Sequence, residues 1–159
     1  FRTGEDGRAV QEESFRAHID MARRLDKTLQ IHDRDAHDDV LRVLEDEGPP
    51  ERVVFHCFSG DVEMARYCSE RGWFVSYAGP VTFRNAASTR EALAATPLQN
   101  VLVETDAPFL TPHPFRGQAN ASYLMPLTVR TMADVLERDL VEVCDALRTN
   151  AFRALGGEW

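Results

Sequence analysis

The sequence lacks the long apolar runs and the cysteine patterns that mark membrane or secreted proteins. None of its apolar runs approaches ~20 residues, the length a helix needs to cross a bilayer, and no signal peptide heads the chain. Its three cysteines, Cys57, Cys68 and Cys144, are an odd number without CxxC spacing, so no disulfide framework is expected. We therefore expect no membrane partner and a cytoplasmic location, where thiols stay reduced.

Two further absences concern nucleotides and nucleic acids. The chain has no Walker A run and no G-x-G-x-x-G run, so nucleotide binding through a glycine-rich loop has no support. With 18 basic and 26 acidic residues its formal net charge is -8, which argues against a general phosphate-binding surface. A nuclease with locally positive charge stays open, because bound divalent ions are the largest charges in such a site.

Length and composition are those of one ordinary globular domain. The 159 residues are 43% hydrophobic and 28% charged, which is enough to form a hydrophobic core. The first residue is Phe1 rather than methionine, and residues 2–7 have the composition of a loop. We therefore expect the chain to be a piece of a longer protein.

Three apolar stretches end in residues that can bind a metal ion. Thr-Leu-Gln-Ile-His ends at His32, Arg-Val-Val-Phe-His ends at His56, and the longer Asn-Val-Leu-Val-Glu-Thr-Asp ends at Asp106. Such runs are typical of strands buried in a parallel sheet, and α/β barrels keep their chemistry at the carboxyl ends of those strands. Imidazoles and a carboxylate are ligands for a divalent hydrolytic metal, so these residues predict a metal site.

Helical patterns alternate with these strands. The connections are too short for anything but right-handed parallel crossovers, so the order predicts an α/β fold of four consecutive βα units, half of an eight-stranded barrel. Apart from the three stretches above, the pattern predicts one more strand at 73–77 and helices at 12–25, 36–47, 61–71, 89–95, 126–136 and 141–147, with a helical turn to 155.

A long proline-containing segment, Pro108–Ser122, leaves the acidic strand end directly. Loops of this length without structure of their own are usually functional or disordered, and we expect this one to bind substrate. Arg34, two residues past the first strand end, is a candidate contact for an anionic substrate, with a surface ion pair as the alternative.

The remaining candidates for catalysis are weaker. His18 is expected at the surface of its helix, and His37, five residues from His32, is not expected on the same face as a ligand. For His113 in the loop, a phosphate contact is the alternative to simple exposure. Cys57 follows His56 directly, so their side chains point to opposite faces of a strand and do not form a thiol–imidazole dyad.

Four stretches, with their order and spacing, resemble one known family over essentially all 159 residues. The chain is similar to the TatD family of metal-dependent deoxyribonucleases, (β/α)8 barrels of the amidohydrolase-like superfamily, and specifically to their second half, strands five to eight and the C-terminal helices. The matching stretches are Gln30–Ala36, Phe55–Gly60, Val103–Leu110, and Arg116-Gly117 with Asn120.

The resemblance implies a two-metal hydrolase that cuts DNA, often from a 3′ end, with magnesium, manganese or zinc. It implies that His32 and His56 hold one ion, and that Asp106 binds at the other and helps deprotonate or orient the attacking water. It also implies that three residues lie near the substrate: Arg34, Arg116 and Asn120.

The chain departs from the family pattern in two places. The family's His-x-His pair and its bridging glutamate belong to strands one and four, so only three of the usual six ligands are here, and we expect residues 1–159 to be a single partial domain without its N-terminal half. The loop has Asn-Ala-Ser where the family typically has Asn-Glu-Pro.

A half barrel leaves two parallel edge strands unpaired, so we expect pairing with the missing half or self-association through the open edges. We also expect the chain alone to be inactive. Two alternatives stay open: a metal-dependent hydrolase of other esters or amides, and a non-catalytic half-barrel module.

Overall fold

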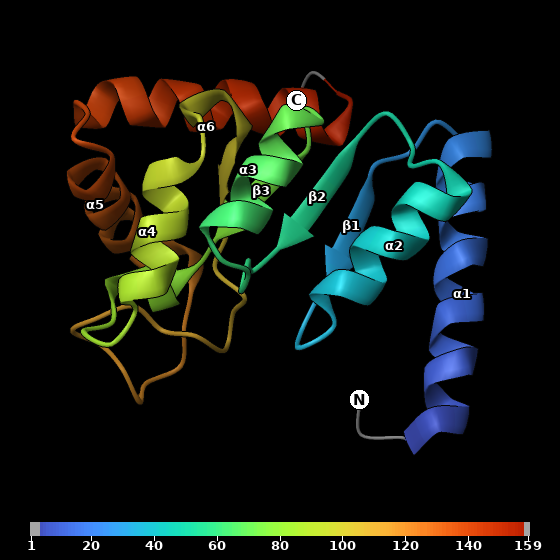
Figure 1. Cartoon of the computed structure of the whole chain (residues 1–159). Helices are drawn as coiled ribbons and strands as arrows, with labels where there is room; N and C mark the ends of the chain where they lie inside the picture. The colour runs from blue at the N-terminus through green and yellow to red at the C-terminus, as the bar shows by residue number, and fades with distance from the viewer. Residues whose placement is uncertain (1–3, 158–159) are drawn as a thin grey trace.

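The structure, a computed structural model, describes residues 4–157, with side chains from residue 7 onward. Residues 1–3, part of the segment expected to be a loop, lie outside the described residues, and the rest of that segment is helical. Four parallel strands form one sheet in the order β1-β2-β3-β4 (Figure 1). These strands are β1 (Leu29–His32), β2 (Val53–His56), β3 (Phe74–Tyr77) and β4 (Val101–Val103).

Six α-helices and three short 3-10 turns surround the sheet in the described part of the chain, and their alternation with the strands confirms the α/β prediction. The helices are α1 (Gly4–Arg24), α2 (His37–Glu47), α3 (Val62–Glu70), α4 (Ala87–Ala95), α5 (Met125–Leu136) and α6 (Leu140–Leu155), and the turns are η1 (Gly79–Thr82), η2 (Leu98–Asn100) and η3 (Ser122–Leu124).

Three element boundaries differ from the prediction. Helix α1 begins at Gly4 instead of near residue 12, because its first turns are held by ion pairs to α2 rather than by an apolar stripe. Strand β4 ends at Val103, and Asp106, predicted as its last residue, has a left-handed backbone with φ 55°. Helix α6 is one helix to Leu155, where the pattern predicted a helix at 141–147 and a helical turn to 155, and the polar Asn150 in its last part is buried and bonded.

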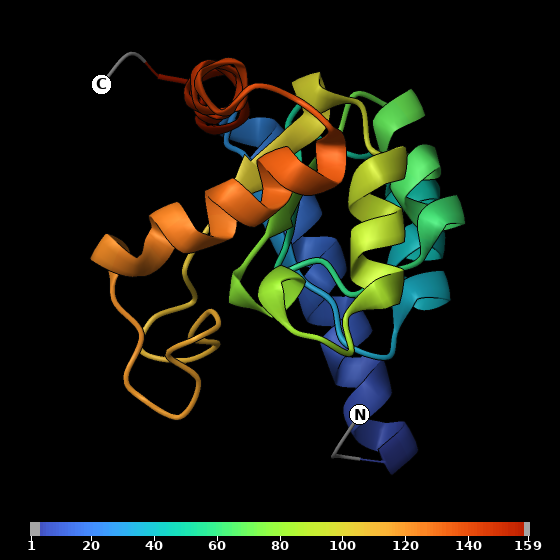
Figure 2. The same ribbon diagram turned by 90° about the vertical axis from the view of Figure 1, so that its left-hand side faces the viewer.

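Side chains alternate between the two faces of each strand. On one face, Ile31, Phe55 and Val75 are buried with residues of all six helices in the main hydrophobic core. Figure 2 shows α2, α3 and α4 together on this side of the strands. Burying such side chains contributes about 1.5–3 kcal/mol each, so this face supplies most of the stability of the fold.

The opposite face of the sheet carries a second, smaller cluster. Here Val54, Phe74 and Leu102 are buried against Ala154 of α6. Helix α6 runs across the amino ends of the strands (Figure 1). The sheet is therefore closed by a helix at its amino end.

Two buried side-chain hydrogen bonds fasten α6 in this place. The Asn150 amide donates to the carbonyls of Leu98 at 2.7 Å and Val101 at 2.8 Å. One turn further toward the carboxyl end of the helix, the Thr28 hydroxyl donates to the Ala154 carbonyl at 2.5 Å. The carboxyl end of the sheet has no comparable helix among residues 4–157, and the strand order leaves β1 and β4 at the sheet edges.

None of the helices in residues 4–157 combines the length and the apolar run that crossing a bilayer requires.

Ion pairs between α1 and α2 predict a pH-dependent stability. Glu12 accepts hydrogen bonds from Arg42 of α2 at 2.9 Å and from Arg16 at 2.8 Å, and these lower its pKa from 4.5 to about 2. Because the pKa is lower in the folded protein, the contribution is complete above pH 4.5 and is lost as the pH falls toward 2. We expect Glu12→Gln to lower the urea midpoint at pH 7, with the difference from the wild type vanishing near pH 2.

Glu13→Gln is the matched control, because Glu13 is exposed on the same helix and makes no ion pair with any described residue. An equal loss of stability in the two variants, or a Glu12 effect that is independent of pH, contradicts the prediction.

Candidate metal centre

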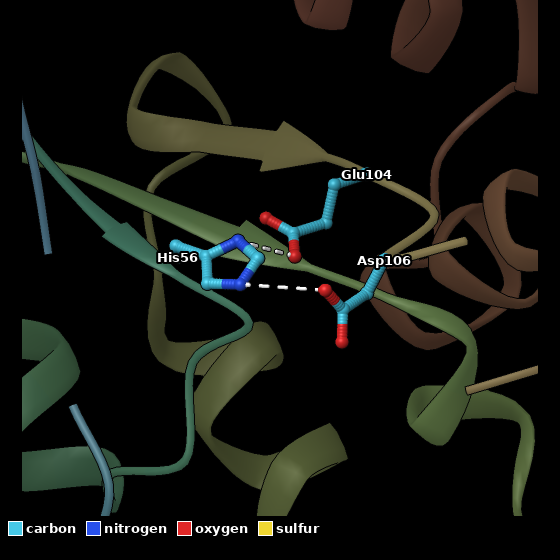
Figure 3. A group of neighbouring side chains, drawn as sticks. All are labelled: His56, Glu104 and Asp106. Carbon is cyan, nitrogen blue, oxygen red and sulfur yellow. Dashed lines mark ion pairs between the residues drawn. The ribbon is translucent and has the colours of Figure 1, made fainter. Parts of the chain in front are cut away.

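Three ligand-type side chains meet at the carboxyl end of the sheet: His56, Glu104 and Asp106 (Figure 3). His56 Nδ1 lies 2.7 Å from Glu104 Oε1, and His56 Nε2 lies 3.6 Å from Asp106 Oδ1. One ligand atom from each residue falls within 4.8 Å of the others. The imidazole and the Glu104 carboxylate are largely buried, whereas 35% of the Asp106 side chain is exposed.

The parallel sheet explains why these residues meet. His56 ends β2 and Glu104 follows β4, so the two side chains reach toward each other across β3, which lies between those strands. Ser76, which follows Phe74 on this face of β3, is small and buried. It lines a hollow of about 270 Å³ together with the three ligand-type residues. A larger side chain at Ser76 would occupy the space in which they meet.

The chemistry of the cluster fits a divalent cation. Glu104 Oε1 is buried and accepts no hydrogen bond, although it lies close to the His56 ring, because the two atoms are not aligned as donor and acceptor. A buried acceptor without a partner is costly, and a cation at this point would satisfy it. Imidazole and carboxylate are both ligand types that zinc accepts, and carboxylates also suit magnesium and manganese.

The predicted ligands are therefore partly assembled. His56 and Asp106 belong to the cluster, whereas His32 lies beside it. His32 pairs with His56 in the β1–β2 register, and their ring centroids are 5.7 Å apart. The His32 side chain is exposed and makes no hydrogen bond or ion pair with residues 4–157, so its imidazole is free to act as a further ligand.

Glu104 is the ligand-type residue that the sequence interpretation missed. The sequence contained the information, because Glu104 and Asp106 are two residues apart and side chains at that spacing share one face of an extended chain. Backbone pairing extends that far, since the Glu104 amide still donates to the Tyr77 carbonyl at 3.1 Å.

A buried carboxylate supports the loop that carries Arg34. Asp33 Oδ2 lies 2.5 Å from His37 Nδ1, at the first residue of α2, and the Asp33 carbonyl accepts a hydrogen bond from Ser59 at 3.1 Å. His37 is thus occupied by a structural contact, as expected for a residue that is not a ligand. Between the two anchored ends of this turn, Arg34 stays exposed.

The pKa of Cys57 depends on the carboxylates of the cluster and also on Arg34. Burial, together with the carboxylates of Glu104 and Asp106, raises the pKa of the Cys57 thiol to about 11, while Arg34 acts in the opposite direction. A thiol with this pKa is protonated near neutral pH, which agrees with the rejection of Cys57 as a nucleophile. The pKa of Cys57 is thus raised by the carboxylates and lowered by the Arg34 guanidinium.

The long loop after β4 is fastened at its base by Asn120. The buried Asn120 amide donates to the carbonyls of Thr105 at 2.7 Å and Phe109 at 2.8 Å, and its oxygen accepts from the Ala121 amide at 2.9 Å. Asn120 therefore shapes the loop, and its predicted contact with substrate stays a prediction. Arg116 lies over the Phe83 ring with its guanidinium carbon 4.1 Å from the ring centroid, and its substrate contact likewise stays a prediction.

Comparison with known proteins finds the same family along almost the whole chain. The family described as TatD related DNase matches residues 1–156. An uncharacterized metal-dependent hydrolase of Mycobacterium tuberculosis, TatD, is 51% identical over 150 residues, which cover 94% of this chain and 57% of that protein. YabD of Bacillus subtilis, also an uncharacterized metal-dependent hydrolase, is 39% identical over 146 residues, covering 91% and 57%.

A solved structure agrees. The crystal structure of YjjV, a TatD homologue from Escherichia coli, superposes with a TM-score of 0.82 at 27% identity, covering 88% of this chain and 54% of that one. The chain thus spans little more than half the length of the relatives it matches.

The protonated state of Cys57 predicts its reactivity. In metal-free protein near neutral pH, we expect iodoacetamide to modify the exposed Cys144 well before Cys57. We expect the rate of modification at Cys57 to rise as the pH increases toward about 11. Peptide mass spectrometry after timed alkylation measures both rates. Equal rates at the two cysteines would contradict the partial burial and the raised pKa of Cys57.

The backbone of η1 packs closely on the long loop, and this predicts that the loop keeps its position only if residue 79 is a glycine. A Cβ at Gly79 would lie 1.9 Å from the Leu110 carbonyl oxygen, which is backbone and cannot turn away. We expect Gly79→Ala to displace the loop and to lower the free energy of unfolding by about 1–3 kcal/mol. Urea unfolding and limited proteolysis within residues 107–124 measure the two effects.

Gly72→Ala is the control, since nothing lies within 4 Å of its added Cβ and only the left-handed backbone at φ 72° is strained. It should leave cleavage of residues 107–124 unchanged. A Gly79→Ala protein whose loop is as resistant as the wild type would contradict the close packing.

Proposed function

The chain belongs to the family of TatD-related DNases, and from this premise we propose that it forms part of a metal-dependent hydrolase that cleaves phosphodiester bonds of DNA. The observation that carries the proposal is the cluster of His56, Glu104 and Asp106, in which a buried Glu104 oxygen has no hydrogen-bond partner. The chain has a net charge of -8, so binding an anionic substrate requires positive charge near the site. A cation in this cluster would supply it.

The residues of the cluster take different parts in the proposed reaction. His56 and Glu104, both largely buried, would hold a divalent ion (magnesium, manganese or zinc), with Asp106 completing the set and His32 close enough to join it. Once bound, such an ion supplies Lewis-acid polarisation of the phosphodiester and lowers the pKa of water. The more exposed Asp106 carboxylate can also accept or orient a proton of the attacking water.

Binding of the substrate phosphates falls to the arginines at this rim. Arg34 is exposed between two anchored ends of its turn, and its charge reaches the thiol beside His56. A guanidinium presented in this way can bind phosphate oxygens with two parallel hydrogen bonds. We assign Arg34 to a phosphate next to the scissile bond and Arg116 to a more distant one.

We further propose that the four strands are strands five to eight of a (β/α)8 barrel and that further metal ligands come from residues outside this chain. The edge strands β1 and β4 and the match to little more than half of each relative support this assignment. The remainder of the barrel is then the partner that covers the sheet edges, and DNA is the substrate of the completed site.

The metal site can be tested on the chain alone. We expect isothermal titration with Mn²⁺ to give one site whose affinity falls about tenfold or more in Glu104→Gln and in Asp106→Asn, because each change removes a negative ligand. Glu51→Gln, which removes a surface carboxylate with 85% of its side chain exposed, should bind Mn²⁺ as the wild type does. Unchanged affinity in both cluster variants would contradict the ligand assignment.

Activity is tested by completing the site. We expect no release of nucleotides from an oligonucleotide by the chain alone, and metal-dependent release after mixing with the portion of the Mycobacterium tuberculosis relative that this chain does not match. The Asp106→Asn chain should abolish release in the same mixture. Turnover of lactones or phosphotriesters but not of DNA would instead support another hydrolase of the same fold.

A further inference from the structure

The loop between β4 and α5 carries large aromatic side chains that face solvent. Phe109 is 68% exposed, Phe115 is 38% exposed and Tyr123 is 77% exposed. Exposed aromatic side chains gathered on one segment are typical of a binding surface rather than of a solvated loop. The loop leaves the carboxyl end of β4 directly (Figures 1 and 2), and Asp106 of the candidate metal centre lies at its start.

The loop is held firmly, so these rings are presented in fixed places. Besides the bonds of Asn120 at its base, the Thr111 hydroxyl donates to the Gln118 carbonyl at 2.6 Å, and the His113 amide donates to Thr82 at 2.8 Å. Gly79 lets the backbone of η1 pack directly on Leu110. A loop whose backbone is already fixed loses less entropy when a ligand binds, because only the side-chain rotamers remain to be ordered.

Phe109 is the ring tied most directly to the metal centre. Its amide donates to the Asp106 carbonyl at 2.9 Å, which closes a four-residue turn over the two residues between them. The α-carbons at the ends of such a turn are less than about 7 Å apart. Phe109, whose ring is exposed, and Asp106 are therefore close in space on one hydrogen-bonded turn.

The charge of the chain favours a nucleobase as the ligand of this ring. Counterion release on contact with phosphates supplies most of the affinity of basic nucleic-acid-binding proteins, and a chain with a net charge of -8 has little of it. Stacking of bases on aromatic rings provides affinity that does not depend on charge. A base stacked beside Asp106 would also place its own phosphodiester at the cluster.

We propose that Phe109 is a stacking platform for a terminal nucleobase of the substrate, and that this contact selects nucleic acids over other phosphodiesters. The proposal rests on the proposed phosphodiesterase function and adds its specificity residue. Phe109 stacks on the base, and the turn from Asp106 to Phe109 fixes the distance between the base and the metal ligands.

The test uses a short oligonucleotide with 2-aminopurine at its 3′ end and methylphosphonate linkages. The linkages are uncharged and resist hydrolysis, so binding of the base is measured without metal and without catalysis. Stacking quenches the fluorescence of 2-aminopurine. We expect the wild-type chain to quench it saturably, and Phe109→Trp to bind at least as tightly, because it retains an aromatic face.

Two variants separate the ring from mere apolar volume. Phe109→Ala and Phe109→Leu should each weaken binding about 5- to 100-fold and lose the quench, since neither has an aromatic face. Val141→Ala, which truncates an apolar side chain of similar exposure (66%) on α6, should bind as the wild type does. Circular dichroism checks that each variant is folded.

The inference is overturned if the wild type does not quench the probe, or if Phe109→Leu binds and quenches as the wild type does. Failure of this inference and failure of the proposed function give different results. Quenching that depends on the ring, in a chain whose completed site never cuts DNA, would sustain the nucleobase site and remove the hydrolase assignment. Metal-dependent cleavage that is indifferent to Phe109 would do the reverse.

Discussion

Alternation of side chains along parallel strands decides what this chain can place at its carboxyl rim. One face of each strand is buried beneath helices, so ligand-type residues can only occupy the other face, at the ends of the strands. His56 and Glu104 both lie on this face, although their strands β2 and β4 are not neighbours. They meet across the small Ser76 of β3, the strand between them. The buried Glu104 oxygen without a hydrogen-bond partner is the energetic cost of this meeting, and a cation would relieve it.

The rest of the molecule holds this rim in place from two sides. Helix α6 closes the amino end of the sheet through the buried Asn150, so the strands are fixed at the end away from the chemistry. At the carboxyl end, the loop after β4 is fastened by Asn120 and by the backbone contact at Gly79. The site is thus built on rigid elements, and exposed aromatic and cationic side chains project from them into solvent.

Much of this could be predicted from the sequence. Short apolar runs predicted β1, β2 and β3, and the helices predicted at 36–47 and 61–71 lie within a residue of α2 and α3, because these are local effects. The start of α1 was not predictable in this way, since ion pairs to α2 hold it and such pairs bring together residues about 30 positions apart. The role of Asn120 was equally hidden, because a buried amide that bonds backbone carbonyls resembles a surface loop residue in sequence.

The candidate site could be predicted only in part, because the sequence shows where strands end but not which side chains meet across the sheet. His56 and Asp106 end predicted strands and were identified, whereas Glu104 was treated as part of the strand. The measurement that tests the metal centre most directly is anomalous diffraction from crystals of this chain soaked in Mn²⁺. The predicted result is a single strong peak within about 2.0–2.3 Å of a His56 ring nitrogen and of carboxylate oxygens of Glu104 and Asp106. A peak at another place, or none at a concentration that saturates binding in solution, would contradict the site.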